Sequence, residues 1–132
     1  MIAVDTNILI RLLVRDNEEQ YKKSYHLIQA NSIFVSNTVF LETEWVLRFT
    51  YRFPRMHIIE ALRRIAGLQN AQTQDIMALQ LALEWHEQGL DFADALHLSL
   101  SQYCTQFVTF DRKFARRSKA LNSIPVGLAD NF

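Results

Sequence analysis

Short apolar runs alternate with longer amphipathic segments along the chain. Runs at residues 2–4, 33–35 and 107–110 are each followed at once by polar residues, which is typical of buried parallel strands that end in a turn. A last short strand is predicted at 124–128. Between the runs, apolar residues recur every three or four positions and predict helices over 8–15, 17–30, 39–51, 57–67, 72–88, 91–103 and 112–119.

Local signals mark several of the predicted helix ends. Asn17 stands before two glutamates, as an N-cap does, and Gly89 follows a helical segment, as a C-terminal glycine does. Pro54 ends the segment that precedes it. That segment, 39–51, is apolar on nearly every side, and we expect it to be largely buried.

Strands that alternate with helices predict an α/β fold, with a parallel sheet covered by helices on both faces. The length, 132 residues, fits a single domain over 1–132. Hydrophobic residues make up 49% of the chain, which excludes disorder as its main state. Lysine plus arginine and aspartate plus glutamate each number 14, so the chain has no global positive field to attract nucleic acid.

The single cysteine and the N-terminal residues bear on location. Cys104 has no partner for an intramolecular disulfide, which fits a reducing compartment. The sequence begins MIAVDTN, without the basic and then apolar pattern of a secretory signal, and no apolar run of about 18 residues could span a membrane. We therefore expect a cytoplasmic protein with no membrane partner.

Four acidic residues fall where an α/β fold places its ligand site. Asp5 and Asp111 directly follow predicted strands, and Glu42 and Asp94 lie in the first turns of predicted helices. Ligands bind at the carboxyl ends of parallel strands, so these side chains could converge there. The aspartates also have a simpler explanation as helix caps, which we prefer for Asp91.

Periodicity does not choose between Glu42 and Glu44. Glu42 shares an apolar helical stripe with Val46, and Glu44 shares another with Leu47. Two carboxylates about 4 Å apart repel by about 4 kcal/mol at an effective dielectric constant of 20, so several acids in one pocket need a cation. Oxygen ligands without Cys or His favour Mg²⁺, with Mn²⁺ as a substitute, and such a site suits phosphoryl transfer.

Four segments of the sequence carry a family resemblance: VDTNILIRLL, FLETEWVLR, DFADALHL and VTFDRKF. In this order they resemble the PIN-domain ribonucleases and, among these, the VapC toxins of bacterial VapBC toxin–antitoxin pairs. The resemblance covers essentially the whole chain and implies a parallel sheet of four or five strands between helices. It also implies Mg²⁺-dependent endonucleolytic cleavage of RNA that leaves a 5′-phosphate and a 3′-hydroxyl.

The resemblance implies the same role for each of the four acids. Asp5, Glu42, Asp94 and Asp111 fall on the catalytic and metal-binding positions of the family. The family pattern Glu-x-x-Trp-Val-Leu selects Glu42, because it stands three residues before a tryptophan. Glu44 then becomes a surface acid or one that supports the site.

Polar and basic neighbours are expected to assist these acids. Hydrogen-bonding support is expected from Asn7, Thr109 and Asp91. The basic segment after Asp111 is expected to contact RNA phosphates without reading sequence, through Arg112, Lys113, Arg116 and Arg117. A solvated helix face is an equally good explanation of this segment. A second group, Phe49, Tyr51 and Phe53, is interleaved with arginines and could stack bases, although core packing or a dimer surface is the simpler explanation.

VapC toxins commonly cut tRNA or rRNA at one structured site and usually form homodimers. The expected partners are therefore an RNA substrate, a second copy of the chain and a VapB-type antitoxin, with DNA reached only through that antitoxin. Two other functions stay open: a non-catalytic scaffold that binds RNA or a partner, and a metal-dependent deoxyribonuclease. A dehalogenase-type phosphatase is disfavoured, because Asn7 stands where its second aspartate belongs.

Overall fold

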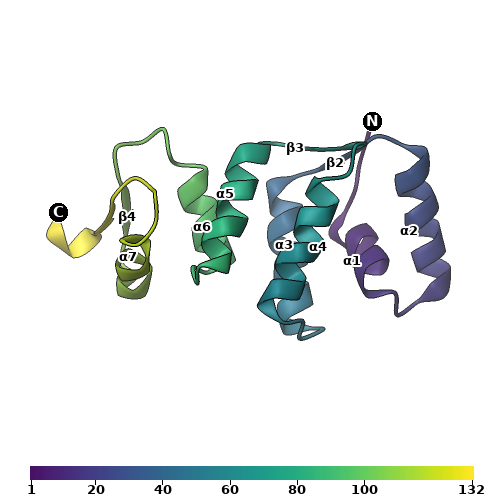
Figure 1. Ribbon diagram of the computed structural model, residues 1–132, viewed down its shortest axis with the longest axis horizontal. Helices are drawn as coiled ribbons and strands as arrows, with labels where there is room; N and C mark the ends of the chain where they lie inside the picture. Colours follow the sequence, from purple (N-terminus) through teal and green to yellow (C-terminus); the bar gives the residue numbers. More distant parts are fainter. The chain divides into compact units, whose positions relative to one another are not determined.

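The computed structural model describes residues 1–132 and divides into two compact units. Unit 1 spans Met1–Ile76 and unit 2 spans Met77–Phe132, and each is described here by itself. The units together contain seven α-helices, five strands and a short 3₁₀ helix (Figure 1). No helix has both the length and the apolar character that a membrane span requires.

Unit 1 is built on a parallel sheet of three strands in the order β1-β2-β3. Its strands are β1 (Ile2–Ala3), β2 (Ile33–Val35) and β3 (Ala71–Thr73). Two helices connect each pair of neighbouring strands: α1 (Thr6–Val14) and α2 (Glu18–Ala30), then α3 (Asn37–Phe49) and α4 (Arg55–Ala66). Because the strands are parallel, α1 and α3 both begin at the carboxyl edge of this sheet.

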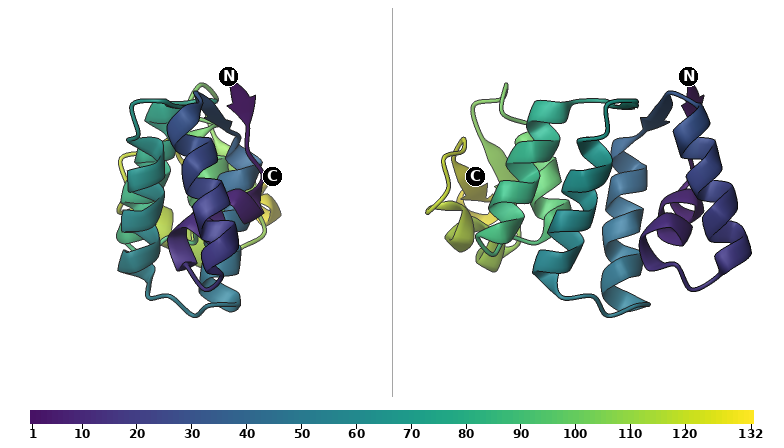
Figure 2. Two further views of the ribbon diagram at one scale, coloured as in Figure 1. Left: turned by 90° about the vertical axis from the view of Figure 1, so that its right-hand side faces the viewer. Right: turned by 45° about the vertical axis from the view of Figure 1, so that its right-hand side comes forward.

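Residues of the sheet and of the inner helix faces form the core of unit 1. Ile33 and Val35 of β2 are fully buried, as are Leu9 of α1 and Phe40 and Leu47 of α3. Helix α1 packs against both α2 and α3, and the right-hand view of Figure 2 shows α1 and α2 side by side. The start of α3 is therefore held close to α1, which fixes the side chains at the carboxyl edge.

The expectation that α3 is largely buried is wrong for one of its faces. Phe40 and Leu47 are buried, but Trp45 is 54% exposed and Phe49 is 53% exposed. Apolar residues occur on nearly every side of this helix, yet unit 1 covers only one side of it. The exposed rings lie against each other, with centroids 5.0 Å apart.

Unit 2 contains a two-stranded parallel sheet and three helices. The strands are β4 (Phe107–Thr109) and β5 (Val126–Leu128), with Phe107 opposite Val126. The helices are α5 (Ile76–Glu87), whose first residue belongs to unit 1, α6 (Phe92–Ser99) and α7 (Arg112–Ser118). A 3₁₀ helix, Ala129–Asn131, follows β5.

The α/β fold predicted from the sequence is confirmed, and strands β1, β2 and β4 lie where they were predicted. The expected single sheet differs from the two sheets described, one in each unit. The N-cap role of Asn17 is also confirmed, since its side chain accepts a hydrogen bond from the backbone of Gln20 at 3.1 Å. At Gly89, which ends α5, φ is 116°, a conformation that favours glycine. The single domain over 1–132 stays a prediction.

Two predicted helices have the wrong bounds. Residues 72–73 belong to β3, not to a helix, because they pair with β2 in a register that joins Val35 to Thr73. The helix predicted over 91–103 ends at Ser99, where two polar side chains bind carbonyls of the last turn. Ser101 donates to the His97 carbonyl at 2.7 Å and Gln102 donates to that of Leu98 at 2.9 Å, so local hydrogen bonds end the helix early.

Candidate active site

Asp5 connects β1 to α1 without acting as a side-chain cap. It occupies the N-cap position with an extended backbone, φ −85° and ψ 163°, but its carboxylate makes no capping hydrogen bond. The side chain is exposed at the carboxyl edge of the sheet. The capping alternative is therefore not realised, and both carboxylate oxygens remain available to a ligand.

Glu42 is anchored next to Asp5 by a residue that the sequence analysis missed. The hydroxyl of Thr6, the first residue of α1, donates a hydrogen bond to Oε1 of Glu42 across 36 positions of sequence. Thr6 is only 4% exposed, so this hydroxyl has little freedom to turn elsewhere. The sequence shows only a β-branched hydroxyl directly after Asp5, and the contact itself depends on how α1 packs against α3.

Glu44 has a structural role in unit 1. It is 2% exposed, and its carboxylate accepts two hydrogen bonds from the Arg48 guanidinium, at 2.7 and 3.1 Å. Of the two alternatives predicted for Glu44, the surface position is therefore wrong, because the buried stripe of α3 is the one that contains Glu44 and Leu47. Glu42 lies on the more exposed side of the helix, where its second oxygen can meet a ligand.

Asn7, which was expected to support the acids, points to a different place. It lines a cavity of about 230 Å³ between α1 and α2, together with Arg11 and Leu27. The hydrogen bond that reaches the acids from this segment comes from Thr6. Support by Asn7 stays a prediction.

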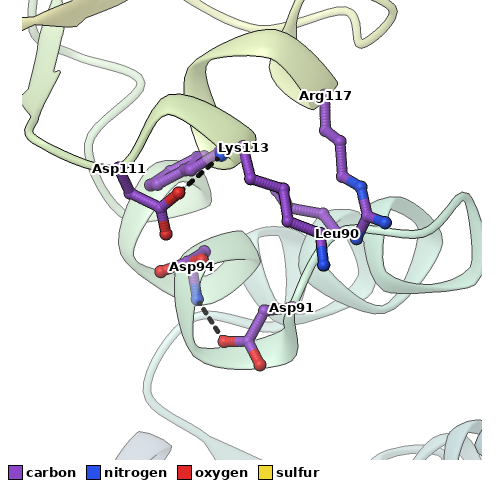
Figure 3. A pocket seen from close by; sticks show the side chains of 7 residues that line it. Leu90, Asp91, Asp94, Asp111, Lys113 and Arg117 are labelled. Carbon is purple, nitrogen blue, oxygen red and sulfur yellow. Dashed lines mark hydrogen bonds between the residues drawn. The ribbon is translucent and has the colours of Figure 1, made fainter.

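Unit 2 gathers three carboxylates around one pocket of about 350 Å³ (Figure 3). Asp91 and Asp94 come from the start of α6, and Asp111 comes from the turn between β4 and α7. Lys113 and Arg117 of α7 line the same pocket. Asp91 and Asp111, 20 positions apart in the sequence, thus line one pocket because the starts of α6 and α7 face each other.

Two of these aspartates are also helix caps. Asp91 accepts a hydrogen bond from the backbone N–H of Asp94 at 3.3 Å, and Asp111 accepts one from that of Phe114 at 3.0 Å. Thr109, predicted to support the acids, accepts a hydrogen bond from the backbone N–H of Asp111 at 3.0 Å. Capping and pocket lining are thus compatible, since a carboxylate has more acceptor positions than one cap bond uses.

The electrostatics of this pocket centre on Asp94. Burial raises the pKa of its carboxyl above the usual range, and the negative charges of Asp91 and Asp111 raise it further, while His97 acts in the opposite direction. The charged form of Asp94 is therefore unfavourable in the pocket as it stands. A cation bound among these oxygens would offset the negative charges that disfavour the ionised form of Asp94.

The donor set fits a hard divalent cation in its chemistry. The pocket offers carboxylate oxygens, with no cysteine or histidine in its lining, as Mg²⁺ and Mn²⁺ prefer. The described residues contain no group of three or more histidine, cysteine, aspartate or glutamate side chains that is ready to hold an ion by itself. Mg²⁺ commonly binds through one or two carboxylates and keeps several waters, so two or three acids at a pocket are compatible with it.

The basic segment divides into two sets. Lys113 and Arg117 face the acidic pocket, and Arg117 is anchored by a 2.8 Å hydrogen bond to the Gly89 carbonyl. Arg112 and Arg116 line a separate cavity of about 400 Å³ beside β5. The four cations predicted to form one phosphate-contacting group therefore lie on two sides of α7, in pairs four residues apart.

A comparison with protein families identifies the chain over most of its length. Residues 2–120 match the family model of the PIN domain. The chain belongs to the PIN domain family. PIN domains are generally nucleases and typically use divalent metals, which agrees with the acidic pocket. The comparison with curated proteins gave no match.

The four acids predicted from the sequence fall two in each unit. Unit 1 contains Asp5 and Glu42 at the carboxyl edge of its sheet, where Thr6 joins α1 to α3. Unit 2 contains Asp94 and Asp111 in one pocket. The PIN domain match extends across both units.

Proposed function

We propose that this PIN domain is a Mg²⁺-dependent endoribonuclease of the VapC type, with Mn²⁺ as a possible substitute. The observation that carries the proposal is the pocket in which three carboxylates gather and in which burial, together with the charges of Asp91 and Asp111, raises the pKa of Asp94. A carboxyl group whose ionisation is disfavoured in this way is costly for a fold that needs only stability, so it indicates a functional site. The four sequence motifs supply the VapC assignment.

In this proposal the metal ligands are Asp5 and Glu42 of unit 1 and Asp94 and Asp111 of unit 2. Bound there, a divalent cation would supply Lewis-acid polarisation of a phosphodiester. The chain's own residues position the acids and attract the substrate. Thr6 fixes the rotamer of Glu42, Thr109 orders the backbone that presents Asp111, and Lys113 and Arg117 attract the phosphates of the substrate.

The proposed biological role is that of the toxin in a type II toxin–antitoxin pair. Its substrate would be a structured RNA, either tRNA or rRNA, and cleavage would inhibit translation in the cytoplasm. The proposed protein partners are a second copy of the chain and a VapB-type antitoxin, through which DNA is reached indirectly. The support for these partners is the resemblance of the four motifs to VapC toxins.

The test is cleavage of total tRNA and of rRNA by the purified chain, free of any partner, with Mg²⁺ or with EDTA. We expect discrete Mg²⁺-dependent cuts that disappear in Asp5→Asn and Asp94→Asn. The matched control is Glu60→Gln, which neutralises an exposed acid of α4 that is not among the predicted site residues. Cleavage that persists in EDTA, or in both aspartate variants, would refute the metal mechanism.

The same assay separates the two other functions. Single-stranded DNA offered in parallel would be cut in place of RNA by a deoxyribonuclease. A scaffold would bind RNA in EDTA and leave it intact after Mg²⁺ is added. Induced expression should also arrest growth for a toxin, and the Asp94→Asn variant should not cause arrest.

A further inference from the structure

Helix α3 exposes two aromatic side chains next to each other. Trp45 is 54% exposed and Phe49 is 53% exposed, and they are the only large hydrophobic residues that this helix presents to solvent. Their ring centroids lie 5.0 Å apart with the planes inclined by 45°. About half of each side chain is thus exposed to water, and burial of this surface against a partner would be favourable.

A guanidinium group is held in a fixed position beside these rings. The Arg48 guanidinium carbon lies 4.4 Å from the centre of the Phe49 ring. The buried carboxylate of Glu44 holds the same guanidinium with two hydrogen bonds. Because Arg48 is fixed by Glu44, it supports Phe49 from one side and limits the rotamers that this ring can adopt.

The rings continue the helix face that begins at Glu42. Trp45 and Phe49 stand three and seven residues after Glu42, which places them about 5 and 10 Å further along the helix axis on the same face. Glu42 itself is anchored to Thr6, next to Asp5. The aromatic pair therefore lies on a surface that leads away from the acids of unit 1.

We propose that Trp45 and Phe49 form a stacking platform for a nucleobase in an unpaired segment of the RNA substrate, a role that rests on the proposed function. Every base has a π-face, so stacking on an indole or phenyl ring tolerates any sequence. A planar guanidinium beside the rings also fits a nucleic acid, because arginine stacks on bases and attracts phosphate. The platform positions the strand and takes no part in the chemistry.

The size of the exposed surface favours a base over a second protein chain. Two aromatic side chains of about 150–250 Å² each, half exposed, offer about 200 Å². A stable protein interface needs about 800 Å² from each partner. On α3 itself no other large hydrophobic residue is exposed.

Tryptophan fluorescence tests the platform without cleavage. The chain has two tryptophans, Trp45 and Trp85, and Trp85 is only 2% exposed, so a base that stacks on the surface reports through Trp45. The full chain is titrated in EDTA with single-stranded oligouridylate of about ten nucleotides, a length within the usual site size for single strands. We expect saturable quenching that is lost in Trp45→Phe.

Binding measured by the anisotropy of labelled oligouridylate gives the energetic weight of each ring. We expect Trp45→Ala and Phe49→Ala to weaken affinity about tenfold each, and Trp45→Phe to restore most of the loss, since one aromatic replaces another. The control is Tyr103→Ala, which removes an aromatic ring that is 89% exposed in unit 2. On a cleavable substrate the alanine variants should raise KM and leave kcat nearly unchanged.

Each outcome bears on the platform separately from the nuclease. Oligouridylate that binds without quenching, or that does not bind at all, overturns the platform. So does an unchanged affinity in Trp45→Ala, and a dimer that dissociates in this variant while its RNA affinity stays the same assigns the surface to a second copy. Quenching by oligouridylate together with tRNA and rRNA that stay intact in Mg²⁺ would support the platform and refute the nuclease proposal, because binding is read in EDTA.

Discussion

The acids of the two units differ in what surrounds them. In unit 1, Asp5 and Glu42 are exposed, and the group that holds Glu42 is the neutral hydroxyl of Thr6. In unit 2, Asp94 is partly buried between two further carboxylates, and its pKa is raised by burial and by their charges. The same residue types thus lie in two different settings: a hydroxyl positions Glu42, whereas burial and neighbouring negative charges raise the pKa of Asp94.

The contrast indicates which group of acids lowers the stability of the fold. A carboxylate that accepts a hydrogen bond from a neutral donor does not lower the stability of the native state. A carboxylate surrounded by other carboxylates lowers that stability unless a cation is bound among them. We therefore expect changes to the pocket acids of unit 2 to separate activity from stability, and changes to Asp5, Glu42 or Thr6 of unit 1 to act mainly on geometry.

The largest effect is expected from Asp94→Asn. Removing this carboxylate should lower kcat/KM for RNA cleavage at least about 100-fold, because it removes both a ligand and the charge at the centre of the pocket. The measurement is cleavage kinetics at saturating Mg²⁺, with Glu60→Gln as the control. If raising the Mg²⁺ concentration further restored full cleavage activity, Asp94 would contribute only to the affinity for the metal.

The next effect compares two glutamates of α3. Glu44→Gln should lower the free energy of unfolding by about 1–2 kcal/mol, because it weakens a bidentate ion pair with a buried carboxylate and a half-exposed Arg48. Glu42→Gln should change it by less than about 0.5 kcal/mol and should reduce cleavage instead. Urea denaturation followed by circular dichroism, together with the cleavage assay, measures both. The reverse pattern would exchange the roles assigned to the two residues.

The third effect tests the hydroxyl that positions Glu42. Thr6→Val keeps the shape of a buried side chain and removes its donor, so it should reduce cleavage about tenfold while leaving the unfolding transition nearly unchanged. Thr6→Ser restores the donor and should recover most of the activity. Equal activity in the valine variant would show that Glu42 is positioned by other means.

Local signals in the sequence were enough for much of the fold. The apolar runs at β1, β2 and β4 and the polar residues after them are properties of a few neighbouring positions, as is the cap at Asn17. Strand β3 is different, since Ala71–Thr73 has no apolar run and is a strand because β2 lies beside it. Long-range pairing of this kind leaves no local mark.

The sequence predicted the candidate site to about the same extent as the fold. Positions after strands and at helix starts indicated the aspartates as candidates, and the family resemblance selected Glu42 over Glu44. The Thr6–Glu42 bond joins two helices, and only their packing shows it. The burial of Glu44 likewise depends on which side of an apolar helix meets the core. The division of the basic segment was accessible, because Lys113 and Arg117 are four residues apart, as are Arg112 and Arg116.

The smallest effect tests the raised pKa of Asp94 directly. A carboxyl whose pKa is higher in the folded state than in the unfolded state contributes stability that is fully present below its ordinary pKa and is lost as the pH rises through the folded value. At neutral pH, without metal, Asp94→Asn should therefore raise Tm by a few degrees. At about pH 3, where the wild-type carboxyl is protonated, the difference should vanish. Asp5→Asn, which changes an exposed acid of unit 1, serves as the comparison. Added Mg²⁺ should then raise the Tm of the wild type more than that of Asp94→Asn, since only the wild type keeps the full charge that binding neutralises. A neutral-pH Tm that falls in Asp94→Asn would mean that this carboxylate stabilises the fold, and the contrast between the two groups of acids would be lost.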